Sequence, residues 1–271
     1  SRGCGAGVGS PSMDPSVARN FAAIIDLGAA AHGDRDMFVL GDDRTSWNEM
    51  QARAGRVANA LAAEGVDSQE RVAFIDKNSV EYFEVLYGCA YRNAVTVAVN
   101  WRLAPPEMAY IVNDSQATVL VVHQEFADHL AAFRDDLNHV TTVVVIGDGG
   151  DDASYVAWRD AHGPECEKIP SADSDVCSQL YSSGTTGHPK GVQSTNANFQ
   201  ALFATVDWEM TDDSRNMAVL PFFHIGGGGW ALFGMVNGAT TFTVRDFDPA
   251  GVLRGIETEG ITHAIFVPAM L

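Results

Sequence analysis

Residues 181 to 191 read Tyr-Ser-Ser-Gly-Thr-Thr-Gly-His-Pro-Lys-Gly, and this segment decides how the rest of the chain is interpreted. Its three glycines leave the backbone free to adopt positive φ and to bring N–H groups close to an anion. Four serine and threonine hydroxyls and the ammonium group of Lys190 add further donors. Because few apolar side chains are present, burial explains the segment poorly. The residues therefore predict a loop that binds phosphate groups.

The spacing of the loop distinguishes between kinds of phosphate site. The common template G-x-x-x-x-G-K-[ST] at the start of a helix does not fit, since Pro189 precedes Lys190 and Gly191 follows it. The order instead resembles the signature [ST]-[ST]-G-T-T-G-x-P-K-G of the adenylate-forming enzymes. That family includes acyl-CoA and aryl-CoA synthetases, luciferases and the adenylation domains of peptide synthetases. Residues 182–191 match every specified position of the signature.

The composition limits the classes of partner. A net charge of −18 argues against nucleic acid and anionic lipid, because both require a basic face. ATP and CoA are also anions, so Lys190 and a divalent metal would have to attract them locally. No apolar run approaches the ~20 residues of a membrane helix, and the start of the chain lacks the apolar core of a secretory signal. Four widely spaced cysteines are typical of unpaired thiols in a reducing compartment, so we expect a cytoplasmic protein: Cys4, Cys89, Cys166 and Cys177.

Short β-branched runs alternate with longer amphipathic stretches, which predicts an α/β fold with layered, largely parallel sheets flanked by helices. The clearest strands are 72–75, 95–99, 119–122, 143–146, 179–181, 217–220, 240–244 and 264–267. Helix signals lie between them. Ser46 and Glu49 have the spacing of a capping box, Gly65 can end that helix, and Asn93 can end a helix over 80–91 in the left-handed conformation.

The domain boundaries are predicted from changes in composition. Residues 1–13 are expected to be a disordered leader, 14–170 a first α/β subdomain, and 171–271 the start of a second one that carries the phosphate loop. The boundary is set by the Gly, Asp, Pro and Ser residues of 147–175, where periodicity fades. The last strand is followed by little more than Pro268, which looks like a truncation. By resemblance, the chain is the N-terminal part of an acyl-CoA synthetase without its C-terminal domain, and this fragment alone is expected to be inactive.

Two further segments resemble the same family. Residues 100–115 are similar to a stretch of fatty acyl-CoA synthetases, and their local features predict architecture rather than substrate contact: Pro105 or Pro106 opens a helix and Glu107 suits its N-terminal dipole. Residues 220–227, Leu-Pro-Phe-Phe-His-Ile-Gly-Gly, resemble the aromatic-histidine motif of the family. That resemblance places His224 beside the acyl pocket and the nucleotide. The glycines 226–229 before Trp230 suit a channel for a slim ligand, and Trp230 either lines this channel or packs a helix.

The resemblance implies ATP-dependent activation of a carboxylic acid to an acyl-adenylate and then to an acyl-CoA, with ATP, Mg²⁺ and CoA as cofactor or co-substrates. The implied phosphate contacts are Ser182, Ser183, Gly184, Thr185, Thr186, Gly187, His188, Pro189 and Lys190. Ser182 would lie nearest the metal, and Lys190 and His224 would be catalytic. His224, Gly227 and Trp230 would contact the acid. One departure is Thr195-Asn196, where the family has Thr-His: Asn196 can still cap the next helix, but a histidine contact to nucleotide is missing.

Alternatives remain at this stage. The partners implied are small molecules, with a homo-oligomer open. A fatty acid is favoured as substrate, while aryl-CoA synthetases share much of both segments. A non-catalytic nucleotide-binding fragment and a purely structural domain are the rivals from other classes. G-x-S-x-G and G-x-G-x-x-G do not occur, which disfavours an α/β-hydrolase and a dinucleotide oxidoreductase.

Overall fold

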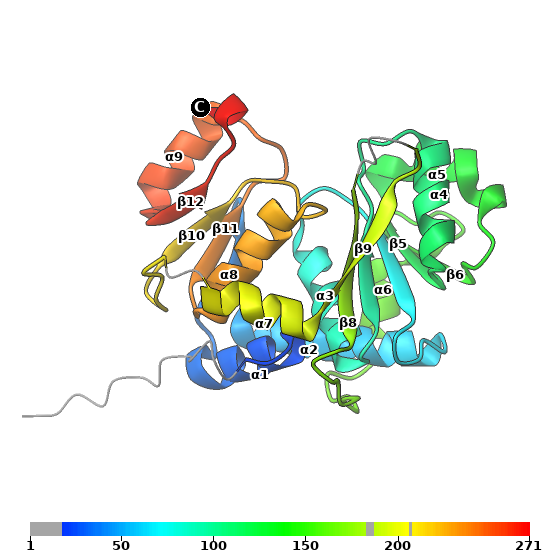
Figure 1. Cartoon of the computed structure of the whole chain (residues 1–271), viewed down its shortest axis with the longest axis horizontal. Coiled ribbons are helices and arrows are strands. Elements are labelled where there is room, and N and C mark those ends of the chain that lie inside the picture. Colours follow the sequence, from blue (N-terminus) through cyan, green and yellow to red (C-terminus); the bar gives the residue numbers. More distant parts are fainter. Residues whose placement is uncertain (1–17, 183–186, 206–207) are drawn as a thin grey trace, which may run out of the picture.

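The computed structural model describes residues 18–182, 187–205 and 208–271, so the expected leader lies outside the described residues. The strands form one sheet of seven and one of five, with helices between and outside them (Figure 1). Neighbouring strands are parallel except for one pair in each sheet. The predicted α/β fold with largely parallel sheets is confirmed.

The seven-stranded sheet includes the strands that precede and follow the predicted phosphate loop. Its order is β7 (Ala153–Ser154), β6 (Thr142–Ile146), β5 (Val119–His123), β3 (Arg71–Ile75), β4 (Val95–Ala98), β8 (Val176–Ser182) and β9 (Lys190–Thr195). β8 pairs in parallel with β4 and antiparallel with β9. β8, Val176–Ser182, is longer than the strand predicted over 179–181. β9 was missed because its polar, largely exposed residues show no hydrophobic alternation.

The five-stranded sheet has the order β12 (His263–Ile265), β10 (Arg215–Ala218), β11 (Thr240–Thr243), β1 (Asp36–Leu40) and β2 (Asp43–Ser46). Only β1 and β2 are antiparallel. β10 ends two residues before the predicted Leu220, because the chain turns at Pro221. Each sheet takes strands from both sides of residue 170. The subdomain boundary at that residue stays a prediction.

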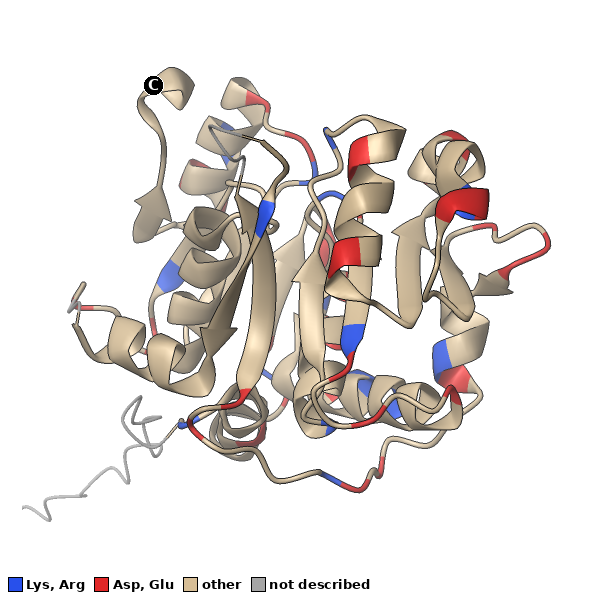
Figure 2. Cartoon of the chain, turned by 45° about the vertical axis from the view of Figure 1, so that its right-hand side comes forward, with Lys and Arg blue, Asp and Glu red and all other residues tan. Residues whose placement is uncertain are grey.

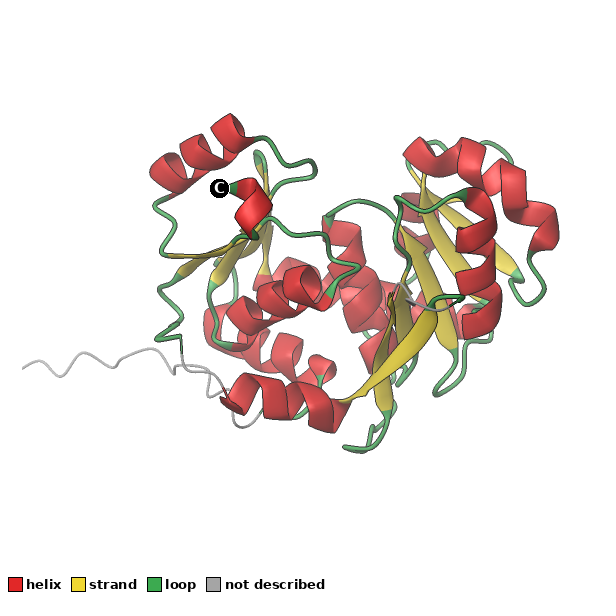
Figure 3. Ribbon diagram, turned by 45° about the horizontal axis from the view of Figure 1, so that its top comes forward, coloured by secondary structure: helices red, strands yellow, loops and turns green. Residues whose placement is uncertain are grey.

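The helices form three layers around the two sheets (Figure 3). The helices are α1 (Phe21–His32), α2 (Trp47–Ala63), α3 (Val80–Tyr91), α4 (Pro105–Ser115), α5 (Ala127–Phe133), α6 (Tyr155–Asp160), α7 (Asn196–Thr205), α8 (Trp230–Val236) and α9 (Pro249–Glu259). Alternation along β3 shows the layering, since Val72 and Phe74 belong to the core shared with α1, α2, α3 and α8, whereas Ala73 and Ile75 pack on the α4 and α5 side. α9 covers the outer face of the five-stranded sheet through Val252.

Several local sequence signals are confirmed. The hydroxyl of Ser46 accepts from the Glu49 N–H, while the Glu49 carboxylate accepts from the Ser46 N–H. Gly65 and Asn93 adopt positive φ after α2 and α3, at +80° and +51°. Pro105 begins α4. The described cysteines, Cys89, Cys166 and Cys177, are free. No helix in the described ranges is long and apolar enough to span a membrane.

The predicted cap of α7 is corrected. The N–H of Asn198 donates to Thr195 Oγ1 over 3.3 Å, and the Thr195 N–H donates to Asn198 Oδ1 over 2.9 Å. Thr195 is therefore the capping residue, whereas Asn196 is the buried first residue of the helix. The Asn196 amide donates to the carbonyl of Ala172 over 2.9 Å, so it anchors the helix to the preceding loop instead of capping it.

Candidate active site

The predicted phosphate loop connects β8 to β9. Ser182 ends β8 and Lys190 begins β9, and the two residues are opposite one another in the antiparallel register. Directly paired residues have Cβ atoms about 4.5–5.5 Å apart, so the side chains of Ser182 and Lys190 extend from the same face of the hairpin. Ser183, Gly184, Thr185 and Thr186 lie outside the described residues. The structure thus brings the two ends of the signature together.

Helix α4 holds both arms of this hairpin. The phenol of Tyr181 donates to Asp114 Oδ2 over 2.7 Å, and the amide of Gln179 donates to the Tyr181 oxygen over 2.9 Å. On the other arm, the ring of His188 stacks on Tyr110 with centroids 4.6 Å apart. Burial, with the carboxylate of Asp114 as the next cause, raises the pKa of Tyr181, which keeps this phenol a donor. Sequence reasoning assigned α4 to architecture and missed both contacts, whose only signal is the i, i+4 spacing of Tyr110 and Asp114.

The glycines of the segment have different structural reasons. Gly187 has φ = +147°, which favours glycine as expected. Gly191 instead packs closely on a side chain of β8, since a Cβ there would lie 2.5 Å from Gln179 Nε2 and would displace that amide. Beside these glycines, the ammonium of Lys190 is exposed and makes no ion pair with any residue in the described ranges. Figure 2 shows Lys and Arg residues scattered among Asp and Glu residues, so this cation stands in a mostly acidic chain.

His224 faces the hairpin across a cavity. A cavity of about 270 Å³ is lined by Leu180, Tyr181, Ser182, Val192, Ser194, Phe223, His224 and Ile225. The structure therefore brings Ser182 and His224, 42 positions apart in the sequence, to one site. The His224 ring lies on the buried ring of Phe223, with centroids 4.4 Å apart. Desolvation lowers the pKa of His224, and the nearby charge of Arg102 lowers it further, which favours the neutral imidazole.

The four glycines after Ile225 form a π-helical turn over Ile225–Gly229. Gly227 is buried, and a Cβ there would lie 2.2 Å from the carbonyl oxygen of Pro221 and 2.4 Å from that of Leu220. Likewise, a Cβ on Gly228 would lie 2.8 Å from the carbonyl oxygen of Phe222. The glycines therefore let this turn pack directly on the backbone that carries His224. Gly227 is not among the residues that line the His224 cavity or the apolar cavity at Trp230, so its contact with the acid stays a prediction.

Trp230 borders a second, apolar cavity of about 240 Å³. Its lining residues are Leu202, Trp208, Ile225, Gly226, Gly229, Trp230, Phe233 and Ile265. Trp230 also packs: its indole donates to the carbonyl of Met217 over 3.2 Å and its ring stacks on Phe233 with centroids 5.9 Å apart. Trp230 therefore both packs against Phe233 and lines an apolar cavity, and its contact with the acid stays a prediction. Ile225 lines this cavity and the His224 cavity, so the two are neighbours.

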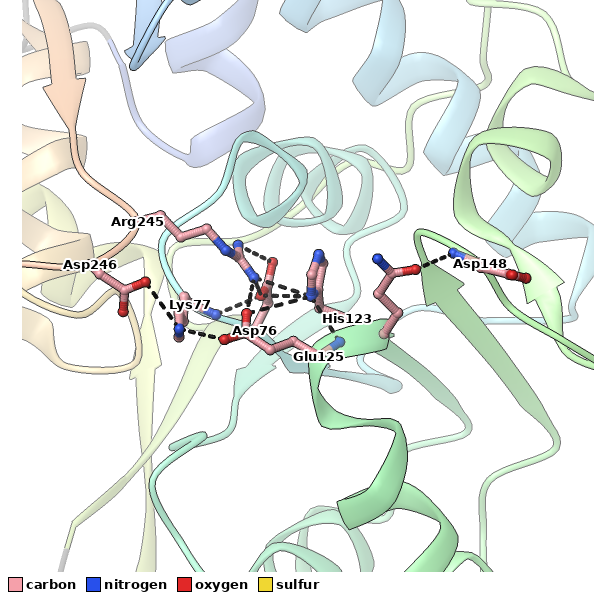
Figure 4. Close-up of polar contacts among 8 residues, drawn as sticks. Asp76, Lys77, His123, Glu125, Asp148, Arg245 and Asp246 are labelled. Carbon is pink, nitrogen blue, oxygen red and sulfur yellow. Dashed lines mark hydrogen bonds and ion pairs between the residues drawn. The ribbon is translucent and has the colours of Figure 1, made fainter.

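A separate group of charges could in principle hold a metal. Ligand atoms of Asp76, His123 and Glu125 lie within 4.8 Å of one another. However, Arg245 Nη2 lies 2.6 Å from Asp76 Oδ1, 2.8 Å from Glu125 Oε2 and 3.1 Å from His123 Nδ1 (Figure 4). The guanidinium already supplies the positive charge at this position. We therefore interpret this group as an ionic link between β3, β5 and the end of β11.

The family is decided by comparison with known proteins. The sequence model described as "AMP-binding enzyme" matches residues 25–271. The chain belongs to this family. A fatty acid–[acyl-carrier-protein] ligase, ScoC, from Streptomyces coeruleorubidus is 34% identical over 89% of this chain and 47% of its own length. The long-chain-fatty-acid–CoA ligase FadD13 from Mycobacterium tuberculosis is 33% identical over 85% of this chain and 46% of its own length.

Solved structures agree with this assignment. The AMP-binding fold of the chain matches the inhibitor-bound N-terminal domain of FACL13 from Mycobacterium tuberculosis with a TM-score of 0.85, at 28% identity, over 93% of this chain and 63% of that chain. It matches the anthranilate CoA ligase AuaEII in complex with anthranoyl-AMP with a TM-score of 0.86, at 28% identity, over 93% of this chain and 50% of that one. The chain spans about half the length of the curated relatives it matches.

Proposed function

We propose that the protein activates a carboxylic acid with ATP, first to an acyl-adenylate with release of pyrophosphate and then, with CoA, to a thioester. A fatty acid is the proposed substrate. The observation that carries this proposal is the juxtaposition of the Ser182–Lys190 hairpin end with His224 across one cavity, beside the apolar cavity at Trp230. An anionic nucleotide and an apolar acid would then meet at the carboxyl ends of β8 and β10, one strand from each sheet, and such strand ends are where α/β folds bind ligands.

The exposed groups at the hairpin suit ATP and Mg²⁺. Ser182 and Lys190 are exposed, and neither side chain has a hydrogen bond or ion pair to a residue that the structure describes. A hydroxyl with free lone pairs can ligate Mg²⁺, and a free ammonium can bind phosphate oxygens. Mg²⁺ would add neutralisation of the phosphate charge. We place both side chains at the departing phosphates, with the loop residues 183–186 between them.

The remaining residues of the site align the acid. Carboxylate is a weak nucleophile and phosphate an anionic target, so the reaction depends on alignment and on charge neutralisation. Lys190 would neutralise phosphate charge. The pKa of His224 is lowered by desolvation and by the charge of Arg102, and a neutral imidazole can donate or accept one hydrogen bond at the acid or the nucleotide without adding charge. His224 and Lys190 are the proposed catalytic groups.

The chemistry of the second cavity supports an apolar acid. Its wall consists of Leu202, Ile225 and Ile265 together with aromatic rings and two glycines, and it presents hardly any polar surface. This lining accepts an aliphatic chain, and it also accepts an aromatic ring. The names of the relatives include feruloyl-CoA synthase and indoleacetate–CoA ligase beside fatty-acid ligases, so an aryl acid is the second candidate. The cytoplasmic location and a homo-oligomer stay predictions.

Acid-dependent exchange of labelled pyrophosphate into ATP tests the proposal, using the full-length gene product with Mg²⁺. Exchange that requires a C8–C16 fatty acid supports it, and exchange that requires an aryl acid supports the second candidate. ATP binding without exchange for any acid would indicate a non-catalytic nucleotide-binding protein. No ATP binding would leave a structural domain.

A further inference from the structure

We propose that Asn78 is a positioning residue, which holds the Leu220–Phe222 backbone so that His224 faces the Ser182–Lys190 hairpin. Asn78 lies in the loop between α3 and β3, a strand of the seven-stranded sheet, whereas residues 220–222 follow β10 of the five-stranded sheet. The inference rests on the proposed function for what His224 does, but the geometry stands without it. Sequence analysis did not single out this residue.

Both the NH₂ group and the oxygen of the Asn78 amide make hydrogen bonds. Its Nδ2 donates to the Leu220 carbonyl and to Thr243 Oγ1, each over 3.2 Å, and its Oδ1 accepts from the Phe222 N–H over 3.0 Å. The side chain is buried, with 4% of the residue exposed. A buried amide that satisfies both an N–H and a C=O of one short segment fixes the position and the rotation of that segment.

The loop that carries Asn78 is itself fixed to the five-stranded sheet. Asp76 receives two hydrogen bonds from Arg245, at 2.6 and 3.2 Å, and Lys77 donates to Asp246 over 3.0 Å (Figure 4). Arg245 and Asp246 follow the end of β11. Three successive residues, 76–78, therefore contact the ends of β10 and β11. Asn78 cannot shift without disturbing the contacts of Asp76 and Lys77, and its bonds fix the 220–222 backbone relative to the seven-stranded sheet.

The chain between Asn78's contacts and His224 has little freedom. The His224 N–H donates to the Pro221 carbonyl over 3.1 Å, and the His224 carbonyl accepts from Gly227 and Gly228 at 2.9 and 3.0 Å. Phe222 and Phe223 are both buried. A rotation of the Leu220–Phe222 backbone would therefore be passed on to the His224 ring. The position of this ring relative to Ser182 depends on a side chain that lines neither cavity.

The chain offers a matched pair of control variants. Thr243 and Thr240 are buried at opposite ends of β11, and each hydroxyl donates to a carbonyl of a neighbouring strand: Ala218 for Thr243 at 2.6 Å, Asp36 for Thr240 at 2.8 Å. Only Thr243 also accepts from Asn78. Thr243→Val and Thr240→Val remove similar groups, so their difference isolates the Asn78 contact.

In the full-length protein, Asn78→Ala and Asn78→Asp should lower the kcat of acid-dependent pyrophosphate exchange by about ten- to a hundredfold, because misplacement of a reacting group costs that much. The KM for ATP should change less than about threefold. Thr243→Val should lower kcat less, and Thr240→Val should match the wild type. Folded Asn78 variants with wild-type kcat, or Thr240→Val and Thr243→Val of equal effect, would overturn the proposal.

A second readout does not depend on activity. NMR titration of the His224 ring in this chain should show its pKa moving up toward the ordinary value in Asn78→Ala and Asn78→Asp, since a released ring becomes better solvated. Thr240→Val should leave the titration unchanged. If His224 titrates identically in wild type and both Asn78 variants, the positioning role is wrong. If the titration shifts but no protein supports exchange, the proposed function fails and the positioning role holds.

Discussion

The phenol of Tyr181 and the carboxylate of Asp114 form a 2.7 Å hydrogen bond that ties the strand before the phosphate loop to helix α4. Tyr181 also lines the His224 cavity, so the bond fixes one wall of the candidate site. On the opposite arm, the stacking of His188 on Tyr110 makes the same connection. Helix α4 thus supports both ends of a loop rich in glycine and hydroxyl residues.

Tyr181→Phe should raise the KM for ATP by about two- to tenfold, because it removes a hydrogen bond, worth about 0.5–1.5 kcal/mol net, that holds the end of β8 on α4. Tyr155→Phe is the matched control, since the Tyr155 phenol donates to buried Glu84 over 2.9 Å, away from both site cavities. That variant should lower the free energy of unfolding and leave the KM for ATP unchanged. Equal kinetic effects of the two substitutions would show that α4 does not support the nucleotide site.

Lys190→Ala should lower kcat/KM for ATP by about ten- to a hundredfold, because a charge-assisted bond to phosphate is worth about 1.5–3 kcal/mol. The same direction is expected for Thr185→Ala from the sequence. Arg254→Ala is the control: Arg254 is an exposed cation whose side chain is 70% accessible, on α9. Steady-state kinetics with varied ATP measure both, and unchanged ATP kinetics in Lys190→Ala would contradict the phosphate-loop assignment.

How far the sequence sufficed depends on the range of the signal. Capping boxes, proline at a helix start and β-branched runs act within a few residues, so α2, α3, α4 and most central strands were predicted closely. β9 was missed because its polar edge residues carry no hydrophobic pattern. Ser182 and His224 were predicted by resemblance to a family motif, and their common cavity agrees with it. Asn78, Asp114 and Tyr110 were missed as site residues, because each acts through a contact distant in sequence; the i, i+4 spacing of Tyr110 and Asp114 puts them on one helix face but does not name their partners.

Trp230→Ala should change the preference among acids of different chain length, since it enlarges the apolar cavity. It should also lower the free energy of unfolding, by up to about 3 kcal/mol, the lower end for aromatic-to-alanine changes, because Trp230 is only partly buried. Trp230→Phe keeps a ring in the cavity and loses the bond to Met217, so it should retain most of the length preference.

Trp158→Phe provides the control for that substitution. The Trp158 indole also makes one hydrogen bond, to Glu64 over 3.1 Å, but the residue lines neither site cavity. Thermal unfolding and a profile over C4–C16 acids separate packing from specificity. A length profile in Trp230→Ala that matches the wild type, at any stability, would exclude Trp230 from the acid site.

The last prediction concerns the pH dependence of stability. His32 is 6% exposed and its ring lies beside that of Trp47, with centroids 5.6 Å apart. Burial lowers the pKa of His32, and the charge of Arg35 lowers it further. His32 of the unfolded chain is therefore protonated near pH 6.5, whereas in the native state it is protonated only at lower pH. The contribution of the neutral ring to the free energy of unfolding is complete above pH 6.5 and declines as the pH falls below it. His123, whose pKa is also lowered mainly by burial, should act in the same direction.

The free energy of unfolding should therefore fall between pH 7 and pH 5.5, by at most about 1.4 kcal/mol per pH unit for each histidine. Urea unfolding at several pH values measures this slope. His32→Gln keeps a polar side chain but cannot be protonated, so it should flatten the slope, whereas the same substitution at exposed His139 should not. Stability that rises as the pH falls through this window, or a slope that His32→Gln leaves unchanged, would show that the buried imidazole does not resist protonation.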